Sequence, residues 1–190
     1  MVKNNEAIIF SGFGGQGVMS IGKLVAYSGM LEDKEVSWLP SYGPEMRGGT
    51  ANCSVLVSTD VIGSPIITNN ATSVIAMNLP SLKKFESSLV KDGLLLVNSS
   101  LVNEKAQRDD IRSYYIPANE LALEKCDNVK VANMIMLGAY LEINQIVNKE
   151  SVLNAFVKVF GENKRNLLPL NEKALEIGSE FIKKELQNVK

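Results

Sequence analysis

The stretch AIIFSGFGGQGVMSIGKLV, residues 7–25, places an apolar run, a glycine-rich loop and a helical pattern in direct succession. The run from Ala7 to Ser11 is apolar almost throughout and ends in glycines, which is typical of a buried strand in a parallel sheet. After the loop, apolar residues recur at helical spacing and predict a helix from Gly17 to Met30. A strand, a tight loop and a helix in this order predict an α/β fold.

The rest of the chain continues the alternation of strands and helices. Strands are predicted at Glu35–Leu39, Thr50–Ser58, Ser73–Met77, Leu94–Val97 and Tyr114–Ile116. Helices are predicted at Pro80–Leu89, Ala118–Lys125, Val131–Ile143, Ser151–Phe160, where Ser151 is the expected cap, and Asn171–Asn188. We therefore predict a single domain over residues 1–190, built as a three-layer α/β/α sandwich with a mixed, mostly parallel central sheet.

Turn residues complete this prediction. Pro40 is expected to stop the second strand, because proline donates no ladder hydrogen bond. Val61–Ser64 is expected to return beside Thr50–Ser58 as a hairpin through Thr59-Asp60, which supplies the antiparallel pairing of the sheet. Asp92-Gly93 is expected to turn the chain into the strand that follows it.

The composition excludes several classes of function. Twenty Lys and Arg residues face twenty-one Asp and Glu residues, so the formal charge of −1 argues against a nucleic-acid partner. The chain has no histidine, which removes imidazole acid–base catalysis and histidine metal sites. Two cysteines, Cys53 and Cys126, cannot supply the four ligands of an iron–sulfur cluster or an all-cysteine zinc site. No carboxylate pair has the spacing of an acid–base dyad, so we predict no catalytic residue and no metal site in this chain.

The sequence also predicts where the protein works. Its N-terminus lacks the layout of a signal peptide, and its longest purely apolar runs are about four residues. A helix that spans a bilayer needs about 20 apolar residues. We therefore expect a cytoplasmic protein with reduced thiols and no membrane partner.

The loop from Gly12 to Gly17 has the spacing G-x-G-x-x-G, for which three interpretations stand. In a dinucleotide-binding fold, an acidic residue about twenty positions later, at the end of the second strand, binds the ribose. That place holds Leu39-Pro40-Ser41, and Glu35 stands at the beginning of the strand, so a nicotinamide cofactor is disfavoured. The two other interpretations are an anion or phosphate site at the helix N-terminus, and a tight turn whose glycines only allow close packing.

A second glycine-rich loop, Ser41–Gly49, carries a single arginine, Arg47. A guanidinium there can fork onto a phosphate or carboxylate of a ligand or partner, or pair internally with Glu45. Because both loops follow strands expected to be parallel, we expect Arg47 and the loop Gly12–Gly17 to lie at the same carboxyl edge of the sheet. The flanking glycines favour close approach of another backbone, so the isolated chain is expected to self-associate, for example as a homodimer.

Two asparagines have structural and functional interpretations. Asn78 lies where a strand ends and a helix begins, so its side chain either caps the helix or faces the crevice at the carboxyl edge. Asn133 lies in an otherwise apolar helix. Because a buried amide must be hydrogen-bonded, we expect Asn133 to tie down a neighbouring loop.

Seven motifs, in collinear order over nearly the whole chain, carry a family resemblance. They are GFGGQGV (12–18), YGPEMRGGTANC (42–53), AMNLPS (76–81), VNSS (97–100), IPANE (116–120), VANMIMLGA (131–139) and NEKALEIG (171–178). With these motifs the chain resembles the gamma subunit of 2-oxoacid:ferredoxin oxidoreductases. The long form of the second motif resembles the 2-oxoglutarate or branched-chain 2-oxoacid members more than the pyruvate members.

The resemblance implies a non-catalytic subunit of a larger enzyme, inactive when isolated. The assembled complex decarboxylates a 2-oxoacid, expected to be 2-oxoglutarate, on thiamine diphosphate. It passes electrons through iron–sulfur clusters to ferredoxin and transfers the acyl group to coenzyme A. Thiamine diphosphate, Mg and the clusters belong to partner subunits, named alpha and beta, with a delta subunit as an open further partner.

The resemblance also assigns six residues to an edge that contacts coenzyme A, another anion or a neighbouring subunit. They are Gly12, Gly14, Gly15, Gln16, Gly17 and Arg47. The rival interpretation is a free-standing nucleotide-binding domain of a dehydrogenase, against which the missing ribose-binding acid counts.

Overall fold

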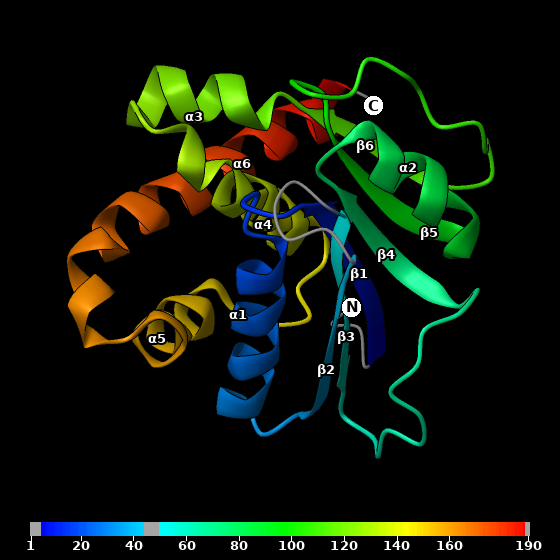
Figure 1. Ribbon diagram of the computed structural model, residues 1–190, viewed down its shortest axis with the longest axis horizontal. Coiled ribbons are helices and arrows are strands. Elements are labelled where there is room, and N and C mark those ends of the chain that lie inside the picture. Colours follow the sequence, from blue (N-terminus) through cyan, green and yellow to red (C-terminus); the bar gives the residue numbers. More distant parts are fainter. Residues whose placement is uncertain (1–4, 44–49, 189–190) are drawn as a thin grey trace.

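A computed structural model of the chain describes residues 5–43 and 50–188. Within these ranges one mixed sheet contains β1 (Asn5–Phe13), β2 (Glu35–Tyr42), β3 (Thr50–Ser58), β4 (Ala71–Ala76), β5 (Leu89–Asn98) and β6 (Arg112–Ile116). Their order across the sheet is β2-β3-β1-β4-β5-β6 (Figure 1). β3 runs antiparallel to both of its neighbours and the other neighbouring pairs are parallel, so β1 and β2 point in the same direction.

The helices cover the two faces of the sheet unequally. They are α1 (Val18–Leu31), α2 (Leu79–Phe85), α3 (Ala118–Cys126), α4 (Ala132–Ile143), α5 (Lys149–Phe160) and α6 (Leu168–Asn188), with short 3-10 turns η1 (Glu86–Ser88), η2 (Val129–Val131) and η3 (Glu162–Leu167). In β1, Ile8 and Phe10 face the side covered by all helices except α2, whereas Ile9 faces the side of α2. The predicted α/β/α sandwich with a mixed, mostly parallel sheet is confirmed, with one thick and one thin helical layer (Figure 1).

The crossing of α4 and α6 depends on two glycines that each face the backbone of the other helix. A Cβ atom on Gly138 would overlap the carbonyl group of Leu175, and one on Gly178 would overlap the carbonyl group of Ile135. α4 is buried on nearly all sides, as its apolar composition predicts. This close packing fixes the start of α4, where Asn133 contacts Gly17 at the start of α1.

The hairpin prediction is wrong, although the sheet is mixed as expected. β3 pairs with β1 on one side and β2 on the other, and Val61–Ser64 forms no strand. The predicted stop at Pro40 is also wrong, because β2 continues to Tyr42. β2 is an edge strand and pairs with β3 on one side only. A proline is tolerated in such a strand where its nitrogen faces away from the neighbouring strand, because no hydrogen bond of the sheet is lost there.

Two local boundaries also differ from the prediction. Asp92, with a φ of 60°, and Gly93 lie inside β5 at an irregularity in its pairing with β4, so the predicted turn is a bulge within one strand. Ser151 is not a cap, because α5 begins at Lys149, after Asn148. Among the described residues, no helix is both long and apolar enough to cross a membrane.

Candidate functional site

The carboxyl ends of β1 and β4 form the topological switch point of the sheet. The two strands are parallel neighbours, but α1 follows β1 on one face of the sheet and α2 follows β4 on the other. The chain leaves this point in opposite directions and opens a crevice, which is where doubly wound sheets bind ligands. The loop Gly12–Gly17 lies on one side of the crevice, and Met77-Asn78 lies on the other.

The glycine loop needs its glycines for different reasons. Gly15 and Gly17 have φ angles of 99° and 74°, a conformation that side chains disfavour. A Cβ atom on Gly17 would collide with the Asn133 side chain, and one on Gly12 would lie 2.7 Å from Gln16 Oε1. Gly14 lies in the turn with Gly15, and nothing lies within 4 Å of a Cβ atom built on Gly15. Close packing therefore accounts for Gly12 and Gly17, whereas Gly15 leaves the backbone accessible from outside.

The Gln16 side chain folds back into the loop and bridges β1 and β4. Its Oε1 accepts hydrogen bonds from the Phe13 amide at 2.6 Å and from Asn78 Nδ2 at 3.1 Å. Its Nε2 donates to the carbonyl oxygen of Met77 at 3.4 Å. The following helix begins with Gly17 as its N-cap residue and has no side-chain cap. The first-turn amides of α1 therefore face the same edge as the crevice.

The two predicted asparagines both contribute to this arrangement. Both predicted roles of Asn78 are present. Its Oδ1 accepts a hydrogen bond from the Ser81 amide at 2.9 Å and so caps α2, and its Nδ2 donates a hydrogen bond to Gln16 in the crevice. Asn133 Nδ2 donates to the carbonyl oxygen of Gly17 at 3.3 Å, which confirms the expected tie to a neighbouring loop. The glycine loop is thus held by side chains from both sides of the sheet.

Two cavities flank the glycine loop and share Lys130 and Asn133. The smaller cavity, of about 160 Å³, includes Gly15, Gln16 and Asn119 in its lining. The larger cavity, of about 280 Å³, extends from Gly17 along an apolar floor that includes Phe156 and Phe160, with Lys164 at its side. Among the described residues that line the two cavities there is no carboxylate, whereas there are two lysines, Lys130 and Lys164. The charge at this edge therefore favours an anionic ligand.

Sequence reasoning missed Lys130 and Asn119 as members of this edge. Lys130 lies in η2 directly before α4, and Asn119 lies in the first turn of α3, where it accepts from the buried Asn98 at 2.9 Å. Tertiary packing brings these helix starts to the glycine loop, and no local pattern encodes it. The available signal was the stretch KVANM at residues 130–134, which pointed only to Asn133.

Arg47 belongs to the segment 44–49, which lies outside the described residues. The described ends of that loop lie at the expected edge. Phe13 of β1 is opposite Thr50 in β3, and Tyr42 of β2 is opposite Ala51, so β1 and β2 end beside the start of β3. Tyr42 is 71% exposed at this edge. The prediction that both loops open at one edge is consistent with these strand ends, while the contacts of Arg47 stay a prediction.

Cys53 and Cys126 are both free cysteines and differ in their burial. Cys53 is fully buried under α1, and burial raises the pKa of its thiol to about 12, so it stays protonated at neutral pH. Cys126 is a second free cysteine at the end of α3. The described residues contain no group of three or more histidine, cysteine, aspartate and glutamate side chains placed to hold a metal. The side chains present therefore do not fit an iron–sulfur cluster, whose ligands are thiolates.

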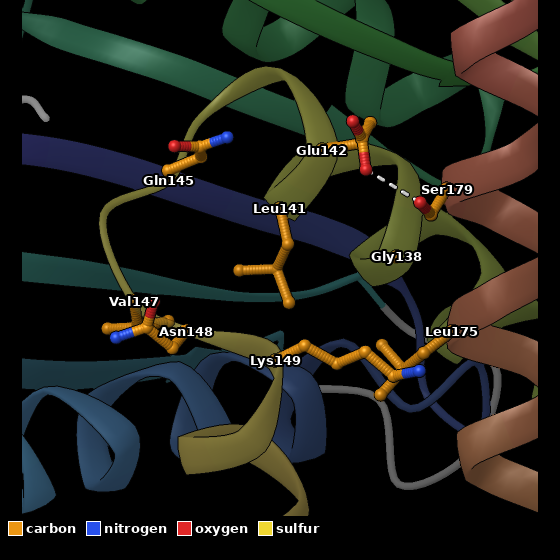
Figure 2. Close-up of a pocket in the computed structure, with 9 residues that line it drawn as sticks. All are labelled: Gly138, Leu141, Glu142, Gln145, Val147, Asn148, Lys149, Leu175 and Ser179. Atoms are coloured by element: carbon orange, nitrogen blue, oxygen red, sulfur yellow. Dashed lines mark hydrogen bonds between the residues drawn. The ribbon is translucent and has the colours of Figure 1, made fainter. Parts of the chain in front are cut away.

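A further cavity of about 290 Å³ lies between α4, α5 and α6, away from the glycine loop (Figure 2). Its charged side chains are already paired within the protein. Glu142 Oε2 accepts from Ser179 Oγ at 2.7 Å and lies 3.2 Å from Lys183 Nζ. Lys149 Nζ lies 2.7 Å from Glu176 Oε1. A ligand here would have to displace these ion pairs, so the carboxyl edge is the stronger candidate site.

Comparison with known proteins adds a family match to this geometry. The family model described as pyruvate ferredoxin/flavodoxin oxidoreductase matches residues 7–181. The ketoisovalerate oxidoreductase subunit VorA of Methanothermobacter thermautotrophicus is 32% identical over 93% of this chain. This chain spans only 36% of that relative. The 2-oxoglutarate synthase subunit KorC of Methanocaldococcus jannaschii is 33% identical over 95% of this chain and 97% of its own length.

Solved structures agree with the fold. The gamma subunit of a keto/oxoacid ferredoxin oxidoreductase from Geobacter sulfurreducens matches with a TM-score of 0.79 at 28% identity, over 94% of this chain and 99% of its own. A 2-oxoglutarate:ferredoxin oxidoreductase from Magnetococcus marinus, solved with 2-oxoglutarate, coenzyme A and succinyl-CoA bound, matches with a TM-score of 0.85. That match is 20% identical and covers 96% of this chain and 32% of the other, so it supports the fold alone.

Proposed function

Because the chain belongs to the pyruvate ferredoxin/flavodoxin oxidoreductase family, we propose that it is the gamma-type subunit of a multi-subunit 2-oxoacid:ferredoxin oxidoreductase. One observation carries the proposal: the gamma subunit of a keto/oxoacid ferredoxin oxidoreductase shares this fold with a TM-score of 0.79 over 94% of this chain. We propose that residues 1–190 form a single domain. Its proposed partners are the alpha and beta subunits of the complex, and a delta subunit is a further candidate.

The proposed substrate of the assembled enzyme is 2-oxoglutarate. Two observations support this choice: KorC of 2-oxoglutarate synthase is 33% identical to this chain, and the motif YGPEMRGGTANC (42–53) resembles the 2-oxoglutarate or branched-chain 2-oxoacid members. Ketoisovalerate is the alternative substrate, because VorA is 32% identical. The complex would release carbon dioxide from the 2-oxoacid, pass electrons to ferredoxin and transfer the acyl group to coenzyme A.

The proposed contribution of this chain is a binding edge rather than a catalytic group. Thiamine diphosphate, Mg and iron–sulfur clusters are proposed to belong to partner subunits, as the family resemblance implies. For the clusters this agrees with the cysteines of this chain, because two thiols, one of them buried with a raised pKa, do not suit cluster ligation. The loop Gly12–Gly17, comprising Gly12, Gly14, Gly15, Gln16 and Gly17, together with Arg47, is proposed to meet an anionic part of coenzyme A or a neighbouring subunit. The lysine-lined cavities beside the loop support an anionic ligand.

A free-standing dehydrogenase domain is the less favoured function. Such a domain binds the ribose of its cofactor with an acidic residue at the end of the second strand. In this chain β2 ends in Leu39-Pro40-Ser41-Tyr42, and its only acidic residue, Glu35, lies at the opposite end of the strand.

The proposed function is tested by purifying the protein through a tag on this chain from its native source. We expect co-purification of larger subunits, with iron and thiamine diphosphate in the complex. We also expect coenzyme A-dependent ferredoxin reduction that is faster with 2-oxoglutarate than with ketoisovalerate or pyruvate. A chain that purifies alone with a bound nicotinamide cofactor would contradict the proposal. Preference for ketoisovalerate would contradict only the substrate.

A further inference from the structure

Two hydrogen-bond donors converge on one oxygen atom at the switch point of the sheet. The Phe13 amide lies 2.6 Å and Asn78 Nδ2 lies 3.1 Å from Gln16 Oε1. The orientation of each amide is fixed by its neighbours. The Phe13 amide can only donate, and Asn78 Oδ1 is engaged by the Ser81 amide, so Asn78 presents its NH₂ group to Gln16. Two donors on one oxygen satisfy both lone pairs of an amide oxygen, and the same two donors can hold an oxygen of an anion.

The oxygen lies where the ladder between β1 and β4 ends. The last bond between these strands runs from the Met77 amide to the carbonyl oxygen of Ser11 at 2.9 Å. Beyond it the strands diverge, and the Gln16 carboxamide spans the gap from the Phe13 amide to the carbonyl oxygen of Met77. The donors therefore face the crevice in which this class of sheet binds ligands, and the protein's own side chain occupies it.

Gln16 borders free space, and Lys130 contributes a positive charge beside it. Gln16 also lines the cavity of about 160 Å³ that Gly15 and Lys130 share. None of the described residues that line that cavity is acidic. If the Gln16 side chain turns into this space, the Phe13 amide and Asn78 Nδ2 become available to a ligand, and Lys130 supplies a positive charge nearby.

We propose that Gln16 Oε1 stands in for a phosphate oxygen, so that Gln16 is a removable occupant of a phosphate site formed by the Phe13 amide and Asn78 Nδ2. This inference deepens the proposed function, since it rests on the glycine loop meeting an anionic ligand. It assigns Gln16 a role as competitor of the ligand rather than as a direct contact. Phosphate binding is then limited by the fraction of molecules in which Gln16 has left the site.

The test compares three variants of the full 190-residue chain, titrated with inorganic phosphate at constant ionic strength. Gln16→Ala removes the occupant and should tighten phosphate binding by about tenfold or more. Gln16→Glu keeps an acceptor oxygen and adds a negative charge, so it should weaken binding below that of the unmodified chain. Asn78→Ser keeps a hydroxyl that can cap α2 but removes the second donor, so in combination with Gln16→Ala it should reverse the gain.

A purely structural Gln16 predicts a different result. As a brace between two strands, its removal would lower the melting temperature and leave phosphate binding unchanged or weaker, and that result would overturn the inference. If Gln16→Ala does not fold, NMR titration of the unmodified chain decides. Phosphate should shift the Phe13 amide and the Gln16 side-chain NH₂ signals together, and unchanged signals refute the inference. Neither readout uses the assembled enzyme, so a failure here leaves the proposed subunit role standing.

Discussion

Gly138→Ala should loosen the crossing of α4 and α6 and destabilise the protein. A Cβ atom at this position would overlap the backbone carbonyl of Leu175, which cannot turn aside as a flexible side chain can. Overpacking of a core costs about 1–3 kcal/mol, and a clash with backbone belongs at the upper end, near 3 kcal/mol. Alanine regains about 1 kcal/mol of helix propensity over glycine. The net loss is therefore about 2 kcal/mol, which for a protein of this size lowers the melting temperature by about 4–8 °C.

The measurement is thermal and urea denaturation of the variant beside a matched control. Gly63→Ala is the control, because nothing lies within 4 Å of a Cβ atom built on Gly63 and its φ is not positive. The control should stay within about 0.5 kcal/mol of the unmodified protein. If Gly138→Ala melts together with Gly63→Ala, α6 can shift without cost, and the reasoning from the glycine contact is refuted.

Three other outcomes are expected. Partial burial of Glu32 opposes its ionisation, but hydrogen bonds from Lys34 and the Asn148 amide lower its pKa overall. Glu32→Gln should therefore lower the melting temperature at pH 7. The difference in melting temperature from the unmodified protein should shrink as the pH falls below about 4.5 and through the lowered pKa of the folded state, which thermal melts at several pH values will measure. In the native protein, Cys53 should resist iodoacetamide at pH 8 while the partly exposed Cys126 reacts, and mass spectrometry can count the labels on each cysteine. Equal labelling of the two cysteines would contradict the burial and the raised pKa of Cys53. Arg47→Ala should change the free energy of unfolding by less than about 0.5 kcal/mol but weaken coenzyme A use or subunit assembly by about 1.5–3 kcal/mol; a lowered melting temperature with unchanged kinetics and assembly would instead indicate an internal ion pair.

The elements that sequence reasoning predicted best are those with local signals. The apolar run before Gly12 predicts the middle of β1, because this strand is buried on both faces. The helical spacing after Gly17 predicts α1 to within one residue at each end. The chain gives no comparable signal for strand order. β3 pairs with β2, which directly precedes it, and also with β1, from which α1 and β2 separate it in the sequence. The apolar alternation of Thr50–Ser58 fits an outer hairpin as well as an inserted strand.

The candidate site divides in the same way. The glycine loop was predictable because backbone conformation requires glycine locally, as the positive φ angles at Gly15 and Gly17 illustrate. The partners of the loop were not. Gln16 meets Asn78 across a separation of 62 residues, and Lys130 reaches the loop only because α4 is held in place by its crossing with α6. A motif can suggest that a loop is functional, but the packing of distant helices decides which charges surround it.

Pro40 in the edge strand β2 has a consequence for aggregation of the chain. An outermost strand with free amides is a template on which other chains can add strands and grow into aggregates. The prolyl nitrogen in the middle of β2 removes one donor from that template, so an incoming strand cannot form an unbroken ladder along it. Pro40 thereby protects this edge of the sheet against the repeated addition of strands from other copies of the chain. Pro40→Val should accordingly raise the tendency of the unassembled chain to precipitate while leaving its fold unchanged.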